Sequence, residues 1–132
     1  MDNRAMMAPV ETVKLSDGTT RRMEFDMGAF AHAENAYELH FGKCVNVNAI
    51  IGELARQQMR AVMAMAYGAM ISAGEKLTWE QFAKGVFTYA DSLTLTDAVA
   101  NAVLKMYRGN DGSGEGDEKN VNSRGAVSSG ST

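Results

Sequence analysis

The chain has 132 residues, of which 45% are hydrophobic and 22% are charged. This length provides one domain with a modest core, and this composition is too apolar for a wholly disordered protein. The net charge of −3 gives no electrostatic reason to bind nucleic acid, and the single cysteine, Cys44, excludes an internal disulfide.

A β-hairpin is predicted at the beginning of the chain. Residues 10–15 and 20–25 show the partly alternating pattern of strands, and Asp17-Gly18 lies between them, where glycine accepts the positive φ of a tight turn. Met23 and Phe25 share one face of the second strand. Because a two-stranded hairpin is marginally stable alone in water, this face is expected to pack on helices.

The next predicted element is a helix over residues 27–40. Asp26 can cap its first turn through the side-chain carboxylate, and Gly42 supplies the stop signal. A second, longer helix is expected to begin at Asn46 or Asn48 and to end at Gly74, because apolar residues repeat there at steps of three and four. Its second half is apolar on all sides, which predicts burial on more than one face.

Two further helices and a tail are predicted in the rest of the chain. Residues 78–81 form a capping box before a helix that runs to about Asp91. A second box at residues 94–97 precedes a helix over residues 98–108. Residues 109–132 consist mainly of Gly, Ser, Asn, Asp and Glu, which cannot bury enough apolar surface to offset the entropy of ordering.

Together these elements predict an α+β, mainly helical fold, in which an N-terminal β-hairpin packs on a bundle of about four helices. The expected organisation is a flexible N-terminus over residues 1–9, a single globular domain over residues 10–108, and a disordered tail over residues 109–132. The longest uncharged apolar run, residues 61–74, is shorter than the roughly 20 residues that cross a bilayer. With no signal peptide visible in residues 1–10, a cytosolic protein is expected.

No constellation of residues predicts chemistry. His32 and His40 lie about 12 Å apart along one helix and have no third ligand, so they do not form a metal site. Glu34 and Glu38 lie one turn apart, but nothing near them in the sequence indicates a cleft that would raise a carboxyl pKa. No nucleophile motif is present. We therefore expect no enzymatic activity, no metal and no cofactor.

The order and spacing of these elements resemble the tail assembly chaperones of long-tailed bacteriophages, particularly the branch found with gene transfer agents. In that family a hairpin leads into a helix with an acidic residue before an aromatic residue and a glycine, then into a long helix with Arg, Ala and aromatic positions, then into a Leu-Thr-x-Glu cap. The resemblance covers about residues 10–108 and rests on Glu34, Tyr37, Gly42, Arg60, Ala61, Tyr67, Leu77, Thr78 and Glu80.

This resemblance implies a protein that binds the tape measure protein and helps recruit tail tube subunits in the host cell cytoplasm, and that is absent from the mature virion. The alternative is a minor structural or tail-completion protein that stays in the virion. A homo-oligomer is left open, and neither nucleic acid nor membrane is expected as a partner.

The chain contains 10 methionines, and methionine suits both irregular cores and adaptable binding surfaces. Under the chaperone hypothesis, the helix around residues 61–71 is expected to offer apolar surface to a partner helix. The candidate contact residues are Met59, Met63, Tyr67, Met70 and Trp79. The alternative is that these methionines only pack the core.

Overall fold

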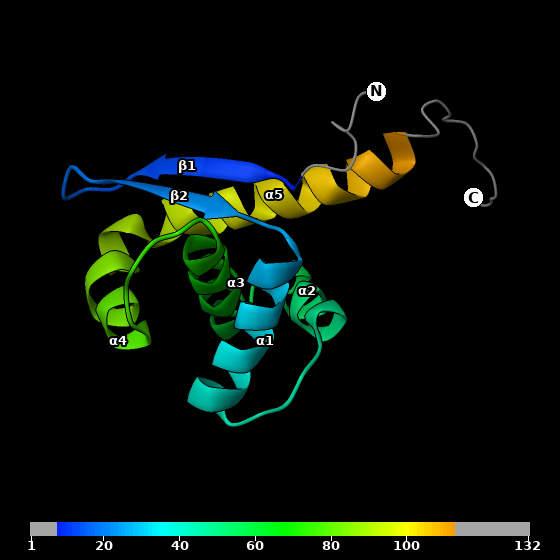
Figure 1. The fold of residues 1–132 in the computed structure, drawn as a ribbon, viewed down its shortest axis with the longest axis horizontal. Coiled ribbons are helices and arrows are strands. Elements are labelled where there is room, and N and C mark those ends of the chain that lie inside the picture. Colours follow the sequence, from blue (N-terminus) through cyan, green and yellow to red (C-terminus); the bar gives the residue numbers. More distant parts are fainter. Residues whose placement is uncertain (1–7, 113–132) are drawn as a thin grey trace. The chain divides into compact units, whose positions relative to one another are not determined.

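A computed structural model describes residues 8–112, with side chains described up to Arg108. It confirms the expected fold class, a two-stranded antiparallel hairpin packed on helices, in a mostly helical chain (Figure 1). Ala8–Val103 form one compact unit. The elements are β1 (Val10–Lys14), β2 (Thr20–Glu24), α1 (Met27–Phe41), α2 (Val47–Ala55), α3 (Met59–Ser72), α4 (Trp79–Gln81), the π-helix η2 (Phe82–Val86), the 3₁₀-helix η3 (Tyr89–Asp91) and α5 (Ser92–Gly112).

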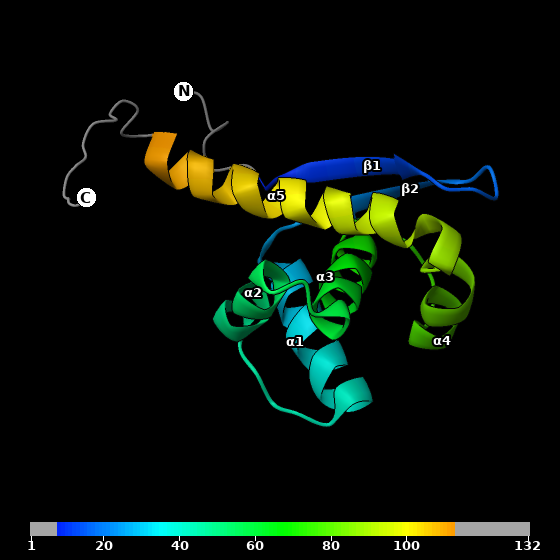
Figure 2. The same cartoon turned by 180° about the vertical axis from the view of Figure 1, so that it is seen from behind.

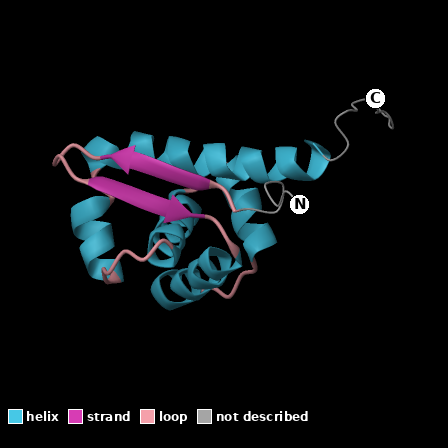
Figure 3. Cartoon of the chain, turned by 45° about the horizontal axis from the view of Figure 1, so that its top comes forward, coloured by secondary structure: helices cyan, strands magenta, loops and turns pink. Residues whose placement is uncertain are grey.

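The hairpin has the expected turn and strand pairing (Figure 3). Gly18 adopts a φ of 90°, and the Asp17 carboxylate closes the turn by accepting hydrogen bonds from the N–H and hydroxyl of Thr19, at 2.9 and 2.7 Å. Val10 pairs with Glu24 and Lys14 with Thr20. The face that contains Met23 is buried, together with Val13, Leu15 and Phe25.

Helix α1 begins where the sequence predicts and ends one residue later, at Phe41. The Asp26 carboxylate accepts the N–H of Ala29 at 2.9 Å, and Gly42 ends the helix in the left-handed conformation with a φ of 72°. Asp26 also accepts a hydrogen bond from the Ser72 hydroxyl, at the last residue of α3. The start of α1 is thereby fixed to the end of α3, and the two helices lie side by side in opposite views (Figures 1 and 2).

The prediction of one uninterrupted helix over residues 46–74 is wrong. The chain forms α2 and α3, with a break at residues 56–58 in which Gln57 has a φ of 59°. The break returns the chain toward α2, so the Arg60 guanidinium reaches the buried carboxylate of Glu53, with Nε 3.1 Å from Oε1. In a continuous helix the backbones of Glu53 and Arg60 would lie about 10 Å apart along the helix axis.

The last helices also differ from the prediction. The capping box at Thr78 and Gln81 is present, but the α-helix that it opens becomes a π-helix at Phe82 and does not reach Asp91. Helix α5 begins at Ser92, so the supposed box at residues 94–97 lies inside the helix. Asp91, the residue before α5, accepts hydrogen bonds from the N–H and hydroxyl of Ser16 in the hairpin turn, both at 2.9 Å, and from the Thr88 hydroxyl at 3.2 Å.

Helix α5 continues to Gly112, four residues beyond the expected end at Arg108. The rest of the predicted tail and residues 1–7 of the predicted flexible N-terminus lie outside the described residues. No helix of the described part of the chain is long and apolar enough to span a membrane. The core of the compact unit is formed by the inner face of the hairpin, most of α3, and buried residues of the other helices, with Met23, Phe25, Tyr37, Ile50, Met65, Met70, Phe82, Leu95 and Val99 the largest side chains that are fully buried.

Candidate partner-binding surface

Helix α3 is the central element of the core, which corrects the view that the segment 61–71 as a whole is a surface for partners. Eight of its residues are buried, because the helix contacts α1 along one side and β2 and α2 along others. Met70 is completely buried and belongs to the core, so in this conformation it cannot contact a partner. Of the candidate methionines, Met70 packs the core, as the alternative interpretation has it.

The other candidates on α3 share one accessible line. Met59 is 49% exposed, and Met63 and Tyr67 are half-buried. They follow one another at steps of four residues, which places them on one face of a helix. The half-buried Trp79 extends this line, because its ring centroid lies 5.2 Å from that of Tyr67. We call Met59, Met63, Tyr67 and Trp79 the Met–aromatic row.

Trp79 is held by rings from three other elements. The imidazole of His40 stacks on it in a nearly parallel orientation at 4.5 Å, and the rings of Phe41 and Phe82 approach it at 5.6 Å. Edge-to-face and offset ring pairs of this kind stabilise packing beyond the area that they bury. His40 therefore packs against an aromatic ring, and the sequence had not indicated that contact.

The other end of the row is anchored by a buried polar cluster. The Tyr37 hydroxyl donates to Glu53 Oε1 at 2.7 Å, and Arg60, the residue after Met59, pairs with the same oxygen at 3.1 Å. Burial would raise the pKa of Glu53, but the hydrogen bonds from Tyr37 and Arg60 hold that pKa below its ordinary value. Burial and the Glu53 carboxylate raise the pKa of Tyr37. Glu53 is therefore ionised and fixes the start of α3.

The histidines and Glu34, which were considered from the sequence as metal ligands or catalytic carboxylates, all lie on α1. The two histidines have exposed side chains on α1, and Glu34 accepts the backbone N–H of Val47 at 2.7 Å, so it supports the start of α2. Within residues 8–112, no group of three or more His, Cys, Asp or Glu side chains is arranged to hold a metal ion. A hollow lined by Thr78, Glu80, Gln81, Lys84 and Gly85 is open to solvent.

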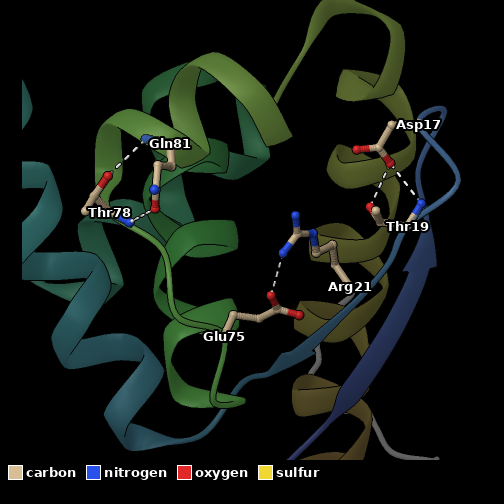
Figure 4. Close-up of polar contacts among 6 residues, drawn as sticks. All are labelled: Asp17, Thr19, Arg21, Glu75, Thr78 and Gln81. Atoms are coloured by element: carbon tan, nitrogen blue, oxygen red, sulfur yellow. Dashed lines mark hydrogen bonds and ion pairs between the residues drawn. The ribbon is translucent and has the colours of Figure 1, made fainter.

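The capping box on one side of this hollow is a structural device. Thr78 N–H donates to the Gln81 side chain at 2.8 Å, and Gln81 N–H donates back to the Thr78 hydroxyl at 3.1 Å (Figure 4). The Thr78 and Gln81 side chains thus cap the first turn of α4, in which Trp79 is the first helical residue.

The chain matches no protein-family model, no curated protein and no solved structure. The functional argument therefore depends on the surface itself. The sequence named all four residues of the Met–aromatic row as candidates. It did not reveal His40 and Phe41, which surround Trp79, because ring contacts between separate helices leave no local sequence pattern.

Proposed function

We propose that this chain is a phage tail assembly chaperone, a non-enzymatic protein that binds the tape measure protein and helps recruit tail tube subunits during tail assembly. The observation that carries the proposal is the Met–aromatic row, a line of accessible soft and aromatic side chains that runs along α3, most of whose residues are buried, to Trp79 in α4. Methionine adapts its shape to a partner, and apolar grooves rich in methionine bind amphipathic helices.

The dimensions of the row suit a helical partner. Met59 and Tyr67 lie about 12 Å apart along α3, which corresponds to about two turns of a helix packed alongside. Such a partner would present apolar side chains at steps of three and four residues. The tape measure protein is long, helical and prone to aggregation before the tail tube assembles around it, as the family resemblance implies. The Met–aromatic row would cover the apolar stripe of the tape measure protein.

The test is co-expression of the chain with the tape measure protein encoded in the same genome. The wild-type chain is expected to keep the tape measure protein soluble and to copurify with it. Met59→Glu places a charge at the most exposed position of the row, and we expect it to reduce the recovered complex at least roughly fivefold, as for a residue that contributes more than 1 kcal/mol to an interface.

Met27→Glu is the matched control. Met27 is also an exposed methionine, at 76%, but it lies at the start of α1, next to Asp26, which is hydrogen-bonded to Ser72 at the far end of α3. The two ends of α3 are about 20 Å apart, so the control introduces its charge far from Met59 and substitutes no residue of the row. A soluble, folded wild-type chain that fails to bind the tape measure protein would contradict the proposal. If both substitutions reduce the recovered complex equally, the Met–aromatic row is not the binding surface.

Mass spectrometry of finished tail particles separates the two roles that a tail protein of this kind can have. A chaperone acts in the host cell cytoplasm and is absent from the particles. A minor structural or tail-completion protein is present in them at a fixed ratio to the tube subunit.

A further inference from the structure

The outer edge of β2 has a pattern of backbone groups and charges that fits a second copy of itself. We propose that two copies of this chain associate by pairing their β2 strands antiparallel about a two-fold axis, with Arg22 of each copy opposite Glu24 of the other. The two hairpins then form one four-stranded sheet. This inference concerns self-association and is independent of the proposed binding to the tape measure protein.

The first argument comes from the backbone. Opposite residues in an antiparallel pair alternate between those that exchange hydrogen bonds and those that do not. The N–H of Phe25 donates to the Pro9 carbonyl at 2.9 Å, and the N–H of Leu15 donates to the Thr19 carbonyl at 2.8 Å. These two bonds show which opposite residues of β1 and β2 exchange hydrogen bonds and which do not. The N–H and C=O groups of Thr20, Arg22 and Glu24 consequently point away from β1.

These outward groups are available for pairing. Among residues 8–112, no other segment forms a backbone hydrogen bond with the outer edge of β2. A strand edge of this kind is a template for another strand unless the protein blocks it with proline, a bulge or an unfavourable charge. Strand β2 contains no proline, and its five residues pair with β1 without a bulge.

The second argument is charge complementarity. A two-fold axis that passes at Met23 places residue 22 of each copy opposite residue 24 of the other copy, so the dimer contains two equivalent pairs. In this register Arg22 and Glu24 are both outward-pointing residues, so each facing pair exchanges two backbone hydrogen bonds and also sets a guanidinium beside a carboxylate. The side chains lie on the solvent face, where Arg22 is 54% and Glu24 29% exposed.

Strand β1 lacks this complementarity. Its outward residues are Val10, Thr12 and Lys14, and Lys14 is the one charged residue among them. No two-fold register of β1 therefore sets opposite charges against each other, and a lysine on an edge strand opposes pairing. The two edges of the hairpin differ, and the charge pattern selects β2.

The cost of forming the pairs is small. Within one copy, Arg22 already contacts Glu24 at 2.8 Å. An exposed ion pair of this kind contributes little to stability, so exchanging it for the equivalent contact with the second copy loses little. Because a single short strand buries less surface than a permanent dimer interface, the dimer is expected to be weak and to depend on protein concentration.

The test is sedimentation velocity of the full chain over a series of concentrations. The wild-type chain is expected to form dimers as concentration rises. Arg22→Glu alone and Glu24→Arg alone each place like charges opposite one another at both contacts, and we expect each to raise the dissociation constant at least roughly tenfold. Lys14→Glu, a charge reversal on the other strand, leaves the dissociation constant unchanged.

The decisive sample is an equimolar mixture of Arg22→Glu and Glu24→Arg. In each variant the internal Arg22–Glu24 pair is lost, yet in a mixed dimer every residue 22 faces a residue 24 of opposite charge. Recovery of dimers in the mixture supports the proposed register. A wild-type chain that stays monomeric, single variants that dimerise like the wild type, or a mixture that stays monomeric would overturn it. Circular dichroism establishes that both variants are folded.

Discussion

Gly68 of α3 lies against the backbone of α1 so closely that a Cβ placed on it would be 2.9 Å from the Ala33 nitrogen and would also meet the Ala29 carbonyl oxygen. The neighbouring α1 side chains at this contact are alanines, Ala29 and Ala33, both buried. Small residues on both helices thus allow their backbones to meet. This contact sets the distance between the two central helices, and hence the position of the Met–aromatic row.

Gly68→Ala is expected to destabilise the fold. The added methyl group meets backbone atoms that cannot rotate away, so the two helices must separate, and overpacking of this kind costs about 1–3 kcal/mol or more. Gly52→Ala is the control, because Gly52 lies within α2 and a Cβ there has no neighbour within 4 Å. It is expected to gain up to about 1 kcal/mol from helix propensity. Urea unfolding measures both, and equal free energies would refute the close packing.

Removing the Tyr37 hydroxyl tests the buried polar cluster. Tyr37→Phe leaves Glu53 buried with one hydrogen bond fewer, and we expect the free energy of unfolding to fall by about 1–3 kcal/mol. Tyr89→Phe removes the same atom from a ring that is 98% exposed and is expected to change nothing measurable. Thermal unfolding followed by circular dichroism compares the two. A loss in Tyr89→Phe as large as that in Tyr37→Phe would contradict the role assigned to Glu53.

The stability of the chain is expected to fall in acid because of Asp26 and Glu53. The hydrogen bond from Ser72 lowers the pKa of Asp26 below the ordinary 3.8, and the pKa of Glu53 lies below its ordinary 4.5. A carboxyl whose pKa is lower in the folded state stabilises the fold above its unfolded pKa and loses that effect as pH falls through the folded value. Unfolding free energy is therefore expected to decrease from about pH 5 downward.

Asp26→Asn isolates one of these groups. Asparagine retains the cap of α1 but does not titrate, so the variant is expected to lose less stability between neutral pH and pH 3 than the wild type. Asp97→Asn, which removes a negative charge from an exposed position in α5, is the control for the loss of one carboxylate. Urea unfolding at a series of pH values gives the comparison. Parallel curves for Asp26→Asn and the wild type would exclude Asp26 as a source of acid sensitivity.

The sequence predicts elements whose signals are local. The turn at Gly18, the Asp26 cap and the capping box at Thr78 each depend on residues within a few positions of one another, and all three are present in the structure. Asp91, the residue before α5, is held instead by Ser16, which is 75 positions away, as well as by the nearby Thr88. No local pattern reports such a contact, so the second capping box was a misleading signal.

The accessible face of α3 could be predicted only in part. The spacing of Met59, Met63 and Tyr67 indicates one helical face, but the helix is apolar all round, so periodicity does not say which face stays open. The structure resolves this through Gly68, which directs one side toward α1, and through complete burial of Met70. Packing between distant segments decides which apolar residues reach the surface.

The break between α2 and α3 was also not predicted, because nothing in the sequence around Gln57 indicates that the helix ends there. Residues 56–58 are Arg-Gln-Gln, all good helix formers without glycine or proline, so propensity favours continuing the helix. The structure nevertheless holds Gln57 at a φ of 59°. For a residue with a Cβ this left-handed conformation costs roughly 1–2 kcal/mol, so contacts elsewhere, among them the Arg60–Glu53 pair, must stabilise the break.

Substitution at Gln57 tests this account in both directions. Gln57→Gly removes the strain of the positive φ and is expected to raise the free energy of unfolding by up to about 1 kcal/mol, even though glycine also makes the unfolded chain more flexible. Gln57→Val is expected to lower it, because a β-branched side chain tolerates this conformation poorly. The side chain is exposed, so neither change disturbs the core. Urea unfolding should rank the variants Gly, Gln, Val in decreasing stability. The order Gln, Val, Gly, which is the order of helix propensity, would mean that the chain continues as one helix through residue 57, in which case Arg60 would no longer be brought back to Glu53.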